Sequence, residues 1–147
     1  MMHSMPMMDA IASLNYVALL AVTVVGFMIG WLWYSPVLFA KAWIAEMKFT
    51  EESMKEAARK GMAGYFIRGF LYTLLGTFGL AVLINAHGST GALAGVKFGL
   101  FVGVTIAGGR LLNASVWENR SMRLMGITLG HEVVLFIVQG AILGVWR

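Results

Sequence analysis

Four long apolar runs fill most of this chain, and no other feature constrains its fold as strongly. At ~1.5 Å of rise per residue, each run is long enough to cross the ~30 Å hydrocarbon core of a bilayer as an α-helix. The runs cover about residues 15–34, 62–85, 91–115 and 122–146. The sequence therefore predicts an all-α integral membrane protein, a four-transmembrane-helix bundle that forms one membrane domain over residues 1–147.

The composition agrees with lipid as the main surroundings of the chain. Hydrophobic residues make up 59% of the 147 residues and charged residues 12%, whereas soluble domains carry about 25% charged residues. Because so little polar surface is available to face water, the bilayer is the first expected partner. The basic residues form no stripe of the kind that binds nucleic acid, so no nucleic-acid partner is expected. The absence of cysteine excludes disulfides, thiolate metal sites and thiol nucleophiles.

One extended polar stretch, residues 36–61, separates the first two runs. Pro36 ends the first run, since proline restricts the residue before it and lacks an N–H donor. Thr50 is typical of a helix N-cap, and Glu51 and Glu56 each lie four residues before a lysine. We expect a short amphipathic helix here, on the membrane surface between the first two spans.

The basic residues are distributed unevenly over the connections, which predicts the topology. One group lies in or beside the first connection: Lys41, Lys48, Lys55, Arg59, Lys60 and Arg68. A second group surrounds the third connection: Arg110, Arg120 and Arg123. Residues 1–13 and the turn 86–90 contain no Lys or Arg. The positive-inside rule then puts the two basic connections in the cytoplasm and both termini outside the cell.

Glycines recur at every fourth position of three spans. The longest series is Gly91, Gly95, Gly99 and Gly103, and shorter pairs occur in the first and last spans. Small residues at this spacing let helix backbones approach closely in lipid. The series is therefore expected either to pack within one bundle or to form the contact surface of a homo-oligomer.

A small set of polar residues is predicted to lie within the membrane. By counting residues along each span, Glu132 is expected slightly inside the midplane, and Arg68 and Arg110 deeper toward the cytoplasm at similar heights to each other. An arginine side chain is long enough to span the remaining gap, so the three can meet in the inner half of the bundle. The full predicted cluster is Arg68, Arg110, Asn113, His131, Glu132 and Gln139. Isolated charges in lipid are costly and are normally paired. The cluster is thus either an internal pairing that holds the bundle together or a functional site.

The N-terminal segment is rich in possible soft metal ligands: Met2, His3, Met5, Met7 and Met8. Thioether and imidazole groups suit Cu(I), so copper binding is one hypothesis, and a disordered chain end is the alternative. No other cofactor is predicted. The sequence contains no HExxH motif, no nucleophile elbow with Ser, His and Asp, and no paired acidic metal cage. An enzyme is therefore the least supported class.

Two separated motifs carry a resemblance to a known family. The first is Gly30-Trp31-Leu32-Trp33-Tyr34-Ser35-Pro36, followed by Phe39, Lys41 and Trp43. The second comprises Asn113, Glu118, Arg120, His131, the run Gly140-Ala141-Ile142-Leu143, and Trp146. Over about residues 14–147 the chain resembles the domain-of-unknown-function 1761 family. That resemblance implies a small four-spanning protein of the bacterial cytoplasmic (inner) membrane, and it implies no reaction, because the family's activity is not established.

Three functions are open from the sequence. The leading hypothesis is a non-enzymatic helix-packing protein, acting as a homo-oligomer or as an accessory subunit of a membrane complex. Its contact surfaces would be the Gly91–Gly103 series and a set of aromatic and charged residues: Trp31, Trp33, Tyr34, Trp43, Trp117, Glu118 and Arg120. The alternative is a small proton- or cation-coupled transporter or channel in which Glu132 binds the ion and Arg68 and Arg110 tune it. Copper handling by the Met-rich segment is the third.

Overall fold

The structure is a computed structural model that describes residues 5–88 and 90–146. Over these residues it consists of helices and connecting loops, without strands, so the predicted all-α class is confirmed. In chain order the elements are α1 (Met7–Ala12), α2 (Tyr16–Trp33), α3 (Ala40–Glu46), α4 (Glu51–Arg59), α5 (Ala63–His87), α6 (Ala92–Phe101), the π-helix η1 (Val102–Gly108), α7 (Gly109–Trp117) and α8 (Met122–Val145).

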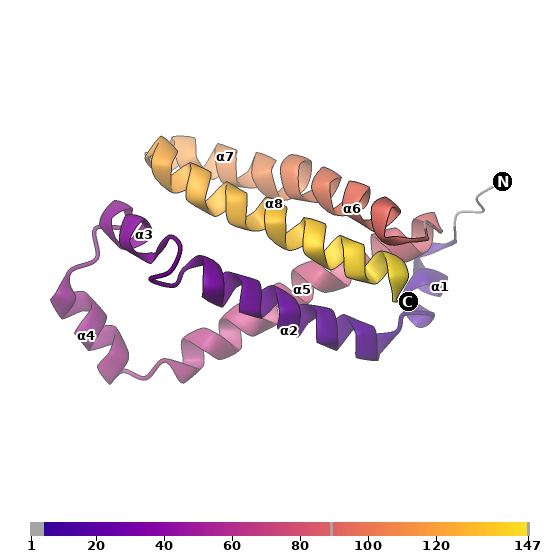
Figure 1. Cartoon of the computed structure of the whole chain (residues 1–147), viewed down its shortest axis with the longest axis horizontal. Coiled ribbons are helices and arrows are strands. Elements are labelled where there is room, and N and C mark those ends of the chain that lie inside the picture. The colour runs from indigo at the N-terminus through magenta and orange to yellow at the C-terminus, as the bar shows by residue number, and fades with distance from the viewer. Residues whose placement is uncertain (1–4, 89, 147) are drawn as a thin grey trace.

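Four helical stretches are long and apolar enough to cross a membrane. They are α2, α5, the continuous helix formed by α6, η1 and α7, and α8. Their bounds lie within two residues of the predicted spans. The stretches run alternately up and down the bundle, α5 crosses α2, and the α6–η1–α7 helix lies alongside α8 (Figure 1). No more than about a third of each membrane-spanning window is buried inside the protein, so most of its surface is left to face lipid.

The helix ends follow from local residues. Asn15 and Ser121 precede α2 and α8, and each side chain accepts a hydrogen bond of 3.0 Å from a backbone N–H in the first turn. At the other end of α5, Gly88 adopts φ +73°, a left-handed conformation that favours glycine and ends a helix.

The connector between α2 and α5 contains two short helices where one was predicted. The predicted N-cap is present, since Thr50 and Ser53 exchange side-chain and backbone hydrogen bonds at the start of α4. The two predicted i,i+4 ion pairs of α4 are also present, at 3.8 Å for Glu51–Lys55 and 2.7 Å for Glu56–Lys60. The additional helix, α3, is separated from α4 by a turn in which Lys48 has φ +56°.

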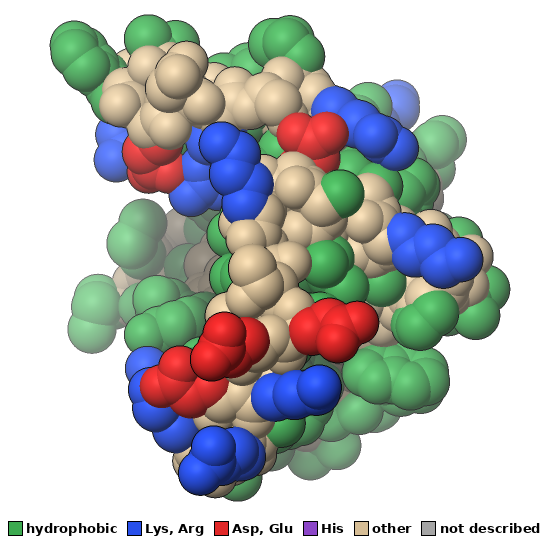
Figure 2. Space-filling view, turned by 90° about the vertical axis from the view of Figure 1, so that its left-hand side faces the viewer, with side chains coloured by type: hydrophobic (Ala, Val, Ile, Leu, Met, Phe, Trp, Pro, Cys, Tyr) green, Lys and Arg blue, Asp and Glu red, His purple; other side chains and the backbone are tan. Residues whose placement is uncertain are grey.

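The two ends of the bundle differ in charge. The connector and the turn between α7 and α8 lie at one end, and Figure 2 shows Lys, Arg, Asp and Glu side chains gathered there. At the opposite end, the backbone N–H of Met5 donates to Ala86 over 2.8 Å, and Asn15, Asn85 and Trp146 line one cavity of about 20 Å³. Both ends of the described chain therefore lie on the same side of the bundle, as the predicted topology requires.

The glycine series packs inside the chain, against α8. A Cβ on Gly95 would overlap the backbone of Gly140, and a Cβ on Gly99 would overlap that of Phe136. The backbone N–H of Gly91 donates to the Gly144 carbonyl over 2.7 Å. We call this contact the glycine seam; it joins Gly91, Gly95, Gly99 and Gly103 to Phe136, Gly140 and Gly144. The seam fits the prediction of packing within one bundle, and it buries Gly95, Gly99 and Gly103.

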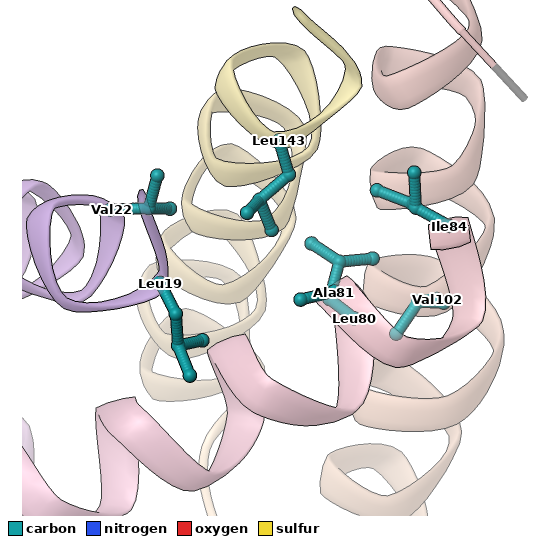
Figure 3. Close-up of a cluster of buried hydrophobic side chains, with 7 residues drawn as sticks. All are labelled: Leu19, Val22, Leu80, Ala81, Ile84, Val102 and Leu143. Carbon is teal, nitrogen blue, oxygen red and sulfur yellow. The ribbon is translucent and has the colours of Figure 1, made fainter. Parts of the chain in front are cut away.

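The main apolar core lies toward the end that holds the chain termini. It brings together side chains from α2, α5, η1 and α8 (Figure 3): Leu19, Val22, Leu80, Ala81, Ile84, Val102 and Leu143. Because lipid tails are as apolar as these residues, their burial gains little from the hydrophobic effect and rests on close van der Waals contact.

Candidate functional site

His131 lies where the end of α2 meets the middle of α8. Its ring centroid is 6.1 Å from that of Trp33 and 5.3 Å from that of Tyr34. Gly30 lies against the third side, where a Cβ would come within 3.3 Å of His131 Nε2. With Glu132, these residues form what we call the His131 site. Its α2 half is the aromatic motif Gly30–Pro36, so the two sequence motifs meet in space.

Trp33 is held firmly in place beside the histidine. Its indole N–H donates to the Ile127 carbonyl over 3.0 Å, which ties the end of α2 to α8. Its ring packs on Phe39 at a centroid distance of 4.7 Å and lies over Gly130, where a Cβ would approach the ring to 3.1 Å. A larger residue than glycine at position 130 would therefore push the indole away from His131.

Tyr34 covers the site from the connector side. It caps α2 one residue beyond the span, and its ring packs on Trp43 at 5.4 Å, which in turn packs on Phe49 at 5.3 Å. Burial raises the pKa of Tyr34 above its ordinary value, a hydrogen bond with the Thr128 side chain lowers it, and the negative charge of Glu132 raises it. With the net pKa raised, Tyr34 stays a neutral phenol at any physiological pH.

The two ionisable groups of the site contact each other. His131 Nδ1 lies 3.1 Å from Glu132 Oε1, and the side chains are 12% and 27% exposed, respectively. His131 Nε2 is buried and has no hydrogen-bond partner in the described part of the chain. When Nδ1–H donates to the carboxylate, Nε2 carries a lone pair that can accept a proton.

Arg68 does not join this site, contrary to the prediction. It is exposed on α5, its Nε donates to the Gly64 carbonyl over 3.1 Å, and its guanidinium lies 5.1 Å from the ring centre of Tyr65. Arg68 lies nine residues before Thr77, and at 100° per residue this spacing puts the two side chains on opposite faces of α5. Thr77 faces α8, so Arg68 points away from α8. Depth alone was therefore not enough to predict that Arg68 meets Glu132, because depth does not determine the direction in which a helical side chain points.

The other members of the predicted cluster also separate. Arg110 and Asn113 are exposed on α7, and neither contacts Glu132 among the interactions of the described residues. Gln139 is 1% exposed, and its amide N–H donates to Thr77 Oγ1 over 2.7 Å. Of the six predicted residues, only His131 and Glu132 are brought together.

The predicted contact residues fall into three places. Trp33, Tyr34 and Trp43 belong to the His131 site or back it, whereas Trp31 and Trp117 are 68% and 82% exposed. Glu118 and Arg120 form an ion pair in the turn before α8.

That ion pair borders a polar pocket of about 430 Å³, which sequence reasoning missed. Glu46 of α3 accepts a hydrogen bond from Ser121 there and lies 3.8 Å from Arg123. Lys48 and Asn119, both with positive φ, line the same pocket. No motif linked Glu46 to Ser121, because 75 residues separate them in the chain.

The methionines of the N-terminal segment do not converge within the described residues. Met5 Sδ accepts from Ser13 Oγ at 3.6 Å, while Met7 and Met8 are 61% and 74% exposed on α1. Met2 and His3 lie outside the described residues. Copper binding by this segment therefore stays a prediction.

The comparisons with known proteins give a family and no activity. A family model described as a protein of unknown function, DUF1761, matches residues 17–144, which include the α2 motif, His131 and the glycine seam. The chain has no significant match among curated proteins or among solved structures. Since the family model matches most of its length, the chain belongs to the DUF1761 family.

Proposed function

We propose that this protein is a small proton-coupled membrane transporter or channel in which the His131–Glu132 pair takes up and releases a proton. The observation that carries the proposal is His131 Nε2, a buried ring nitrogen without a hydrogen-bond partner in the described chain, beside a carboxylate on the other ring nitrogen. Buried polar atoms are almost always paired, so an orphaned one calls for a role. Ionisable groups within membrane spans mark proton and ion pathways by default.

The chemistry of the pair fits that role. Histidine is the side chain whose ordinary pKa, about 6.5, lies closest to physiological pH. Trp33, Tyr34 and Gly30 fix the ring and restrict what reaches it, and Glu132, 27% exposed, is the more open of the two groups. When the ring hydrogen is on Nε2, Nδ1 is the acceptor, and a proton that arrives on Glu132 can pass to it directly because Nδ1 and Oε1 are 3.1 Å apart.

The hypothesis of a helix-packing protein has two proposed contact surfaces. The glycine seam occupies most of the first, the Gly91–Gly103 series, whereas Trp31 and Trp117 of the second are exposed. As part of the present proposal, the protein lies in the cytoplasmic membrane with α3 and α4 in the cytoplasm and both termini outside, because the basic residues gather at the connector end.

Proton flux into vesicles tests the proposal. Purified protein is reconstituted into phospholipid vesicles that contain a pH-sensitive dye, and a potassium gradient with valinomycin drives proton entry. We expect flux above that of empty vesicles, and we expect His131→Gln and Glu132→Gln each to reduce it to the empty-vesicle rate. Arg68→Gln is the matched control. Arg68 lies on the face of α5 that points away from α8, so this variant should leave the flux unchanged.

Stability measurements separate this role from a structural one. Both variants should elute as the wild type in detergent and keep its thermal unfolding temperature within a few degrees, because each replacement keeps a polar side chain of similar size. Loss of flux together with loss of folded protein would favour a structural pairing instead. Wild-type protein that passes no protons would contradict the proposal directly.

A further inference from the structure

A second candidate site lies in the connector, next to the His131 site. A groove of about 420 Å³ runs between α3, α4 and the start of α5. Its lining is mainly apolar: Trp43, Ile44, Phe49, Met54, Ala57 and Tyr65. Phe49 and Met54 are 40% and 39% exposed, so apolar side chains would face water in an empty groove.

The groove continues into the surface that faces the bilayer. Met62 and Tyr65 line it and are 45% and 50% exposed, and the next residues of α5, Phe66 and Ile67, are 48% and 60% exposed. Tyr65, Phe66 and Ile67 belong to a helix long and apolar enough to cross a membrane, so we expect their exposed faces to contact lipid. Trp43 and Tyr65 have the amphipathic rings that are enriched at the membrane–water boundary. The mouth of the groove therefore opens where acyl chains begin.

We propose that this groove holds an acyl chain of a membrane phospholipid. The lining is apolar and continuous with the lipid-facing surface of α5, and Met54 and Met62 are flexible side chains suited to a ligand without fixed shape. The charges of α4 indicate that the groove recognises the acyl chain of the lipid rather than its headgroup. Glu51–Lys55 and Glu56–Lys60 already form ion pairs, and the charges of Glu52 and Arg59 cancel, so this helix offers no net charge to a headgroup.

An occupied groove would border the His131 site through aromatic contacts. Phe49 and Trp43, which line the groove, pack in series onto Tyr34, which packs onto His131. A bound chain thus fixes the rings that cover the histidine. The lipid site itself goes beyond the proposed proton chemistry, and its test does not depend on proton flux.

Photo-crosslinking tests whether a lipid acyl chain occupies the groove. The protein is reconstituted into phosphatidylcholine vesicles doped with a phosphatidylcholine that carries a diazirine in its acyl tail, irradiated, digested with trypsin and mapped by mass spectrometry. The peptide of residues 49–55 lies between two lysine cleavage sites and contains Phe49 and Met54. We expect adducts on this peptide, together with adducts on the lipid-facing part of α5, which serves as the internal reference.

A matched pair of variants tests occupancy of the groove. Ala57→Phe fills it, because Ala57 lines the groove, and should abolish the adducts on residues 49–55 while the α5 adducts persist. Ala58→Phe is the control, since Ala58 is exposed and outside the lining, and should leave both sets unchanged. Met54→Glu, which puts a charge in the groove, should act as Ala57→Phe does, and it covers the case in which that variant fails to fold.

Two outcomes would overturn the proposal. One is labelling of α5 without labelling of residues 49–55 in the wild type. The other is equal labelling of that peptide in the Ala57→Phe and Ala58→Phe proteins. Replacing phosphatidylcholine by phosphatidylglycerol should leave the adducts on residues 49–55 in place, and their restriction to the anionic lipid would show headgroup recognition instead.

Discussion

At the scale of single residues, α8 carries two polar groups with opposite roles. Gln139 and His131 lie about two turns apart on the side of the helix that faces α2 and α5. The Gln139 amide is satisfied by Thr77, whereas His131 Nε2 has no partner among the described residues. Hydrogen bonds between membrane helices contribute about 0.6 kcal/mol on average and up to about 1.7 kcal/mol. We therefore expect Gln139 to act in stability and not in transport.

Replacing Thr77 tests this division. Thr77→Val leaves the buried Gln139 amide without its acceptor and should lower the free energy of unfolding by about 1–2 kcal/mol. Thr105→Val is the control, because Thr105 is exposed and its hydroxyl bonds only to the Phe101 carbonyl of its own helix. Denaturation in detergent micelles measures the free energy of unfolding of both variants. Equal losses in the two variants would mean that the Thr77–Gln139 bond contributes nothing specific.

At the scale of elements, the third span is built for contact with α8. Glycines bring α6 to backbone distance from α8, and η1 then brings Gly103 to Val133, where a Cβ would meet the Val133 Cα at 3.2 Å. A π-helix is wider than an α-helix and is often found at functional positions. Here η1 lies beside the part of α8 that carries His131 and Glu132, and Gly103 approaches the Glu132 carbonyl.

Alanine at Gly99 should separate the two helices. Its Cβ would overlap the Phe136 backbone, which cannot move aside as a side chain can, so Gly99→Ala should cost about 1–3 kcal/mol. Gly79→Ala makes the same change on α5 at a position where no described atom lies within 4 Å, and it should be neutral or stabilise by up to about 1 kcal/mol. Thermal unfolding of both variants in one detergent checks the difference. Wild-type stability of Gly99→Ala would contradict the close approach.

The sequence predicts elements better than it predicts which elements meet. The apolar runs fixed the spans because length and hydropathy suffice for that, and the Thr50 cap and its ion pairs are local to α4. Glycine spacing indicated a helix face suited to close packing, but it did not indicate which helix packs against that face. The His131 site required knowing that the end of α2 lies against α8, and Arg68 was misplaced because its azimuth depends on how α5 crosses α2. No residue pattern signalled η1.

At the scale of the whole molecule, charge is concentrated at one end of the bundle. The connector and the α7–α8 turn hold most of the ionisable side chains, and the opposite end carries both ends of the described chain (Figures 1 and 2). This asymmetry favours one orientation in the membrane over its inverse.

Cysteine labelling in intact cells reports the orientation, and the chain contains no cysteine of its own. Thr90→Cys lies in the turn at the end with the termini, and Ala58→Cys lies on the exposed side of α4. A membrane-impermeant maleimide should label Thr90→Cys in intact cells and Ala58→Cys only after lysis. The reverse pattern would place the connector outside and invert the proposed topology.

The glycine seam also decides which parts of the protein are free to move. Two backbones in direct contact have no side-chain rotamers between them that could rearrange, so α6 and α8 form a rigid hairpin. The end of α2, in contrast, meets α8 through side chains: the rings of Trp33 and Tyr34 and one hydrogen bond from the Trp33 indole to the Ile127 carbonyl. If the His131 site opens, we therefore expect α2 and the connector to move relative to the paired α6 and α8.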